Sequence, residues 1–160
     1  MAFIPLYLID QHHLSTASAA IWLGIIRAAG ILGSLLGGWL SDKWGRKRAI
    51  FLALVATGPT VFLYAHLPFN AALVLILIIY GMLMAMRETT VQTFLMSKTP
   101  LKLQGTVFGI YFGFSMEGTS LLQPVVGNFM DIMGIAVVFH IVSLLSIGLS
   151  LIAAFMARKL

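Results

Sequence analysis

Four charged residues stand inside long apolar stretches, and they are the residues best placed to do chemistry: Arg27, Arg87, Glu88 and Glu117. A charged side chain at the centre of a bilayer costs about 2.5–3.5 kcal/mol on insertion scales. Such residues therefore pair with one another or line a water-filled cavity. Arg87 and Glu88 are neighbours, so on a helix they point about 100° apart. One of them can face a cavity while the other pairs with an adjacent helix.

Two further chemistries are considered for the ionisable residues. A desolvated carboxyl group can be tuned to exchange protons near neutral pH, which leads to the hypothesis that Glu117 or Glu88 carries a coupling proton. A metal site at His12 and His13 is not expected, because neighbouring helix positions cannot both face one ion and no further ligand is near. We expect a polar loop there, and neither a metal nor a cofactor.

The composition excludes several classes of protein. Of the 160 residues, 60% are apolar, the mean hydropathy is +1.01, and only 15 residues (10 basic plus 5 acidic) are charged. In soluble domains about a quarter of the residues are charged, and disordered chains combine low hydropathy with high charge. Neither class fits. The absence of cysteine excludes a disulfide framework, a thiolate metal site and a cysteine nucleophile.

The elements that must position the charged residues are membrane-spanning helices. A crossing of the ~30 Å hydrocarbon layer needs about 20 apolar residues. Five stretches satisfy this length, and all are apolar around every face: 17–41, 49–66, 71–96, 103–129 and 135–157. The alternating pattern of a barrel strand is absent, so an all-α membrane bundle is predicted. The apolar residues 1–9 are too few to cross and are interpreted as the end of another helix, so that the chain begins inside a larger unit.

The distribution of basic residues predicts the orientation. Eight of the ten lie in residues 43–48, 98–102 and 158–159, which five crossings place on one side, whereas the opposite segments have no Lys or Arg. Cytoplasmic loops are enriched in Lys and Arg. We therefore expect a multi-pass protein of the plasma (inner) membrane with a cytoplasmic C-terminus. The basic charges then face the cytoplasm and do not form a nucleic-acid surface.

The segment from Gly38 to Ile50 forms a tight link between two spans. Asp42 ends a helix, where the helix dipole disfavours an acid, so it needs a cation such as Arg46 or the N-terminus of another helix. Gly45 supplies a turn that a Cβ would obstruct. The link is either a basic anchor loop or a latch between moving helices, and the spacing of its residues favours the latch.

This spacing resembles the signature G-x-L-x-D-x-x-G-R-K-x-x-[LI] of the major facilitator superfamily. The matching residues are Gly38, Leu40, Asp42, Gly45, Arg46, Lys47 and Ile50. A second run is similar to the end of that family's fifth and eleventh helices: Pro124, Gly127, Asp131 and Gly134. Gln104-Gly105 departs from the family's usual Arg-Gly. The basic end of the chain resembles the family's C-terminus, so residues 1–160 are expected to be a C-terminal half-domain, from the end of helix 7 to helix 12.

The resemblance implies a secondary transporter that moves a small solute, such as an organic anion or a drug-like compound, by alternating access with ion or proton coupling. In the family, helix 10 lines the solute path, which makes Arg87 the candidate for an anionic solute group. The alternative is that Arg87 is a counter-ion of Glu117 or Glu88. Arg27 is expected to be a structural partner, since helix 8 flanks the path. The expected partners are the bilayer, the solute, and a missing N-terminal half or a second copy.

Small residues recur along two of the expected helices. Gly30, Ser34 and Gly38 are spaced by four residues on the first, and Gly105, Gly109 and Gly113 on the fourth. Small residues let helices approach closely, and the resemblance places these faces against the other half of the transporter. They are either sliding contacts or ordinary tight packing. Pro124 bends its helix and lies in the family-like run, so it is either a hinge or a passive kink.

Two other functions are weighed against transport. A non-transporting membrane scaffold would gain little from four charges inside its spans. An intramembrane enzyme would need a nucleophile and a base, and no motif in the sequence supplies them. The sequence also lacks the phosphate-binding run of a P-loop, so ATP is not expected to drive this chain.

Overall fold

A computed structural model describes residues 3–157, without the side chains of residues 116–119, 154, 156 and 157. The helices, including one short 3-10 turn (η1), are α1 (Ile4–His12), α2 (Thr16–Trp44), α3 (Arg46–His66), α4 (Ala71–Lys98), η1 (Leu101–Leu103), α5 (Gln104–Met133) and α6 (Ile135–Ala157). The described part of the chain contains no strand. The predicted all-α fold is confirmed.

The helices begin and end at residues whose local chemistry favours a break. Ser15 and Asn70 cap α2 and α4, each accepting a hydrogen bond from the backbone N–H three residues later. Gly45 (φ +90°) separates α2 from α3, and Gly134 (φ +85°) separates α5 from α6. A Cβ disfavours this left-handed region, so glycine suits both junctions. The apolar stretches predict a break over residues 130–134, between the last two spans. In the structure α5 stays helical as far as Met133, so the break is reduced to Gly134.

Four of the helices are long and apolar enough to cross a membrane, judged within the described residues: α2, α3, α4 and residues 135–153 of α6. The fifth long helix, α5, has 30 residues, which at about 1.5 Å per residue also exceeds the thickness of the hydrocarbon layer. Each of the five predicted stretches therefore coincides with one long helix.

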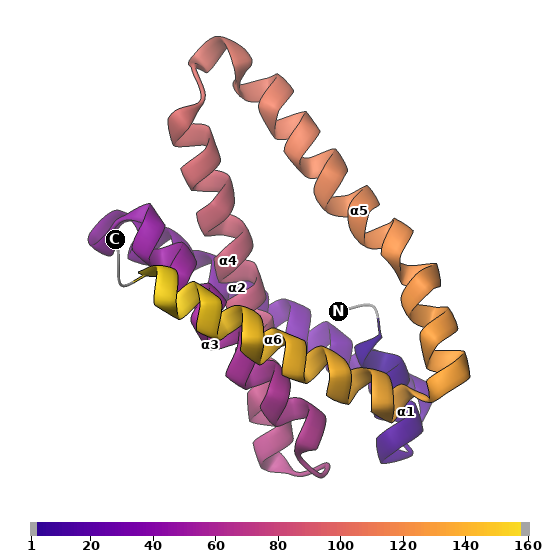
Figure 1. The fold of residues 1–160 in the computed structure, drawn as a ribbon. Helices are drawn as coiled ribbons and strands as arrows, with labels where there is room; N and C mark the ends of the chain where they lie inside the picture. Colours follow the sequence, from indigo (N-terminus) through magenta and orange to yellow (C-terminus); the bar gives the residue numbers. More distant parts are fainter. Residues whose placement is uncertain (1–2, 158–160) are drawn as a thin grey trace.

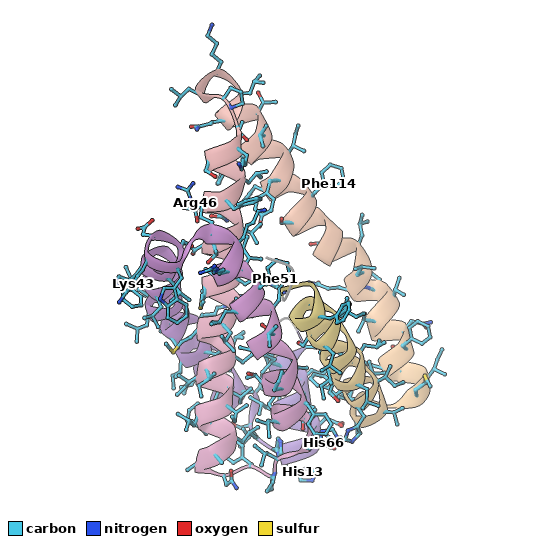
Figure 2. The ribbon with its side chains drawn as sticks, turned by 60° about the vertical axis from the view of Figure 1, so that its left-hand side comes forward. His13, Lys43, Arg46, Phe51, His66 and Phe114 are labelled. Carbon is cyan, nitrogen blue, oxygen red and sulfur yellow. The ribbon has the colours of Figure 1, made fainter. Side chains whose placement is uncertain are left out.

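The helices form a bundle from which α5 diverges (Figure 1). The most extensive packing is between α2 and α4, followed by that of α3 against α6 and α4. α5 joins α4 through η1 and α6 through Gly134, and it leans away from the other helices between these points. Lys43 and Arg46 lie at one end of the bundle, and His13 and His66 at the opposite end (Figure 2).

The short helix α1 is packed into the bundle. Ile4, Tyr7 and Leu8 are buried, and the Tyr7 ring stacks on Phe139 of α6 with ring centroids 4.4 Å apart. The Tyr7 hydroxyl lies 3.3 Å from the carbonyl oxygens of Tyr64 and Ala65, to which it donates. These contacts hold α1 against the C-terminal end of α3, so α1 is part of the folded core.

Candidate functional site

A cavity of about 440 Å³ lies between α2, α4 and α5. Its lining includes Arg27 from α2, Arg87 and Glu88 from α4, and Tyr111 and Ser115 from α5. Three of the four charged residues found inside the apolar stretches thus come together at one cavity. The side chain of the fourth, Glu117, lies outside the described residues, although its position in α5 is two residues beyond Ser115.

Close contact between α2 and α4 places the two arginines at this cavity. A Cβ built on Gly30 would lie 3.3 Å from the Cβ of Ala85, which is tight packing. A Cβ on Gly81 would collide with the carbonyl oxygen of Ile26, so the two backbones nearly touch there. The cavity opens beside these glycines, next to Arg27.

Two glycines outside the set spaced by four residues bring α2 against α4. Gly33 and Gly37 lie against Met82 and Met86 of α4, and a Cβ on either would collide with backbone atoms there. A Cβ on Gly38 would meet nothing within 4 Å, and the Ser34 hydroxyl donates to the carbonyl of Ile31 in its own helix. The face of α2 that packs on α4 therefore follows a spacing of three and four residues, as is usual for helix pairs, while contact of Ser34 and Gly38 with the other half of the transporter stays a prediction.

The arginine side chains at the cavity keep their hydrogen-bonding capacity. Within the described residues, the guanidinium groups of Arg27 and Arg87 form no hydrogen bond or ion pair. Glu88 accepts a long hydrogen bond of 3.5 Å from the side chain of Gln92 on the same helix. No ion pair joins Glu88 to Arg87 among the described residues, and pairing of Arg87 with Glu117 stays a prediction. Among the described side chains of the lining, two cations and one carboxylate give an excess of positive charge.

The small residues of α5 face open space. A Cβ on Gly105, Gly109, Gly113 or Gly127 would meet nothing within 4 Å of the described residues. Pro124 lies inside the helix, and both Pro124 and Asp131 are exposed. Their proposed roles in sliding contacts and hinge bending stay predictions.

The link between α2 and α3 lines a second cavity, of about 630 Å³, together with the C-terminal end of α4. Asp42 and Arg46 both border it. Of the two partners considered for Asp42, a cation such as Arg46 or a helix N-terminus, the ion pair with Arg46 is not formed among the described residues. Both side chains are exposed, and such pairs gain little in water. Lys43 instead places its ammonium group 4.7 Å from the ring centroid of Trp39.

Sequence reasoning missed one contact between helices. The Nδ1 atom of His140 on α6 lies 3.1 Å from the Nε2 atom of His66 at the end of α3. The two residues are 74 positions apart, and no local pattern pairs them. Among the described residues, no three His, Cys, Asp or Glu side chains are grouped so as to hold a metal ion.

Comparison with known proteins identifies the family. The family model described as Major Facilitator Superfamily matches residues 1–121. The chain belongs to the major facilitator superfamily. This confirms the resemblance that the link at residues 38–50 carries, and the membership favours a transporter over an enzyme.

The curated relatives of this major facilitator chain are named as transporters or as a resistance protein. The fosmidomycin resistance protein of Escherichia coli (strain K12) is 27% identical over 146 residues, which are 90% of this chain and 35% of that protein. The probable inositol transporter 3 of Arabidopsis thaliana is 30% identical over 82 residues, 50% of this chain and 14% of that protein. The uncharacterized MFS-type transporter YvkA of Bacillus subtilis (strain 168) is 23% identical over 154 residues, 94% of this chain and 35% of that protein.

The chain thus spans about a third or less of the length of these relatives. No solved structure shows significant similarity to it.

Proposed function

We propose that the chain is part of a secondary transporter that moves a small organic anion or a drug-like compound by alternating access. The observation that carries the proposal is the meeting of Arg27, Arg87 and Glu88 at one cavity between α2, α4 and α5. Charged residues inside spanning helices are costly and mark solute or ion pathways. The names of two relatives, a fosmidomycin resistance protein and a probable inositol transporter, support a small organic solute.

An anionic group on the solute fits the charge and size of the cavity. The guanidinium group of Arg87, which has no partner among the described residues, can bind a carboxylate or phosphate through two parallel hydrogen bonds, and Arg27 adds a second positive charge. The volume of about 440 Å³ is within the range of pockets that bind small molecules. Arg27, expected to be only a structural partner, borders the same cavity and is included in the proposed site.

Proton coupling is proposed for a carboxyl group beside the solute. Glu88 borders the cavity, and Glu117 lies on the helix that forms its other wall. Carboxyl groups inside spanning helices often form part of proton pathways in transporters. Release of the coupling proton would then accompany each transport cycle.

We further propose that residues 1–160 form the C-terminal half of the transporter, in the plasma membrane, with the C-terminus in the cytoplasm. Support comes from the eight basic residues that five crossings place on one side and from the spacing of residues 38–50. The open glycine face of α5 is suited to close packing against a second half, supplied by the same protein or by another copy. The link at residues 38–50 would then act as a cytoplasmic gate between the halves.

The alternative is a membrane scaffold that keeps the fold without the transport cycle. A scaffold does not need two arginines at a cavity between spanning helices, since apolar residues would fill the same space at lower cost. The site therefore favours transport over a scaffold role.

Transport measurements on variants of Arg87 test the proposal. Membrane vesicles that contain the natural protein are assayed for accumulation of labelled fosmidomycin, inositol and a set of small carboxylates. We expect Arg87→Ala to lower accumulation of the transported anion at least about tenfold, as when one hydrogen bond to a charged group is lost. Arg87→Lys is expected to restore little, because lysine lacks the planar fork.

Lys102→Ala serves as the control, since Lys102 is exposed on η1 and borders neither cavity. Full accumulation in both Arg87 variants would remove Arg87 from the solute site. If the unmodified protein accumulates none of the compounds, the scaffold alternative is favoured.

A further inference from the structure

The cavity beside the link between α2 and α3 collects positive charge from two separate parts of the chain. Arg46, Lys47 and Arg48 of the first turn of α3 border it, and Lys98 of the last turn of α4 faces the same space. Asp42 is the one acidic residue in its lining. Four cations against one carboxylate give the cavity a formal charge of +3. Such a charge attracts an anion.

A buried hydroxyl group in the cavity wall lacks a hydrogen-bond partner. Ser41 is only 4% exposed, and its Oγ atom is buried without a partner in the described structure. Ser41 borders the same cavity as the four cations. Buried polar groups are nearly always hydrogen-bonded, so an unpaired hydroxyl beside an open cavity indicates a missing partner. An oxygen-rich anion held in the cavity would accept this hydrogen bond.

The start of α3 adds further hydrogen-bond donors. This helix of 21 residues begins at Arg46, after Gly45, and no side chain caps its first turn, which also contains no acidic residue. The first backbone N–H groups of a helix have no partner within the helix and carry partial positive charge. Phosphate groups are commonly bound in this position. The helix terminus thus supports a site that the cations and Ser41 define.

The position of the cavity indicates where the anion comes from. Trp39 and Trp44 are 54% and 50% exposed near the end of α2, and Trp44 also borders the cavity. Exposed tryptophans at the ends of spanning helices lie at the level of the lipid headgroups. A cavity at this level faces the phosphates of the membrane, and basic pockets between spanning helices bind anionic headgroups.

We propose that the cavity between residues 41–48 and the end of α4 binds the phosphate of an anionic membrane lipid. Arg46, Arg48 and Lys98 supply the charge, and the Ser41 hydroxyl donates to a phosphate oxygen. The proposal does not rest on the solute site, because it concerns a cavity separate from the one that Arg27 and Arg87 border.

The test measures how tightly the purified protein retains phosphatidylglycerol relative to phosphatidylcholine, by native mass spectrometry during delipidation. The variants are Lys98→Gln, the double change Arg46→Gln and Arg48→Gln, and Ser41→Ala. Lys102→Gln removes one charge close by without touching the cavity and is the matched control. Circular dichroism confirms that each variant keeps its helices.

We expect preferential retention of phosphatidylglycerol to fall about fivefold for each cation removed, and to fall in Ser41→Ala although no charge has changed. Lys102→Gln should leave it nearly unchanged. Equal retention of the two lipids by the unmodified protein would overturn the proposal, and so would an equal loss in Lys102→Gln and Lys98→Gln. Displacement of the lipid by inorganic phosphate at the same concentration would assign the site to free phosphate and overturn the lipid assignment.

Discussion

Gly81 of α4 lies directly against the backbone of Ile26 of α2, and a Cβ at position 81 would collide with the Ile26 carbonyl oxygen. This contact fixes how the two helices cross. It brings Arg27, the next residue after Ile26, to the same cavity as Arg87, which lies further along α4. The arrangement of the proposed solute site thus depends on a position without a side chain.

The first prediction concerns this contact. Gly81→Ala should destabilise the protein by about 1–3 kcal/mol, the usual cost of overpacking a tight interface, and lower its thermal midpoint in detergent. Gly24→Ala is the matched control, because a Cβ at this position on α2 would meet nothing within 4 Å. It should be neutral or slightly stabilising, since alanine favours a helix. Equal midpoints for the two variants would contradict the close contact.

The second prediction concerns the pH dependence of stability at the end of α1. Burial, and secondarily the charge of His13, lower the pKa of His12 below its ordinary value. The unfolded chain therefore takes up a proton at a higher pH than the folded protein does. Stability is present in full above about pH 6.5, the ordinary histidine pKa, and is lost as the pH falls below it.

Thermal unfolding measured between pH 7 and pH 5 checks this prediction. The buried Nε2 atom of His12 has no partner among the described residues, so His12→Gln should flatten the pH dependence. His13 is exposed, and His13→Gln should keep most of it. An unchanged slope in His12→Gln would show that other groups cause the loss of stability.

The third prediction concerns the coupling proton. If Glu88 or Glu117 carries it, replacing the responsible residue with Gln should abolish the pH dependence of uptake, because an amide cannot release a proton. Asp10→Asn is the control, since Asp10 is exposed on α1 and does not border the cavity. Uptake driven by a pH gradient across vesicles provides the measurement. Unchanged pH dependence in both glutamate variants would dismiss the hypothesis.

Much of the fold follows from local features of the sequence. The length of each apolar stretch predicts a crossing helix, and Gly45 predicts the break that its positive φ confirms. The four charged residues could be recognised as candidate site residues, because placing a charge in apolar surroundings costs free energy. These inferences need only neighbouring residues, and for this reason they could be made from a single chain.

The relationships between helices could not be obtained in the same way. The meeting of Arg27 with Arg87 depends on the crossing of α2 and α4, which is set by which glycines face each other. The helices also meet through Gly33 and Gly37, which no pattern in the sequence assigned to this contact. The His66–His140 contact likewise depends on the packing of α3 against α6. The periodicity of side chains defines a face of a helix, but it does not show which other helix packs against that face.

The most direct test of the central claim, a watery cavity that attracts anions, uses the absence of cysteine from this sequence. Val91 borders the cavity one helical turn beyond Arg87. Leu75 lies on the same helix and is exposed, but it does not border the cavity. Thiol labelling needs water, so Val91→Cys should react with water-soluble thiosulfonates and Leu75→Cys should not.

The arginines should make an anionic thiosulfonate react about fivefold faster than a cationic one at Val91→Cys, which corresponds to about 1 kcal/mol for a nearby charge in water. Arg87→Gln should reduce this preference. Failure of Val91→Cys to react, or faster reaction with the cationic reagent, would contradict the account.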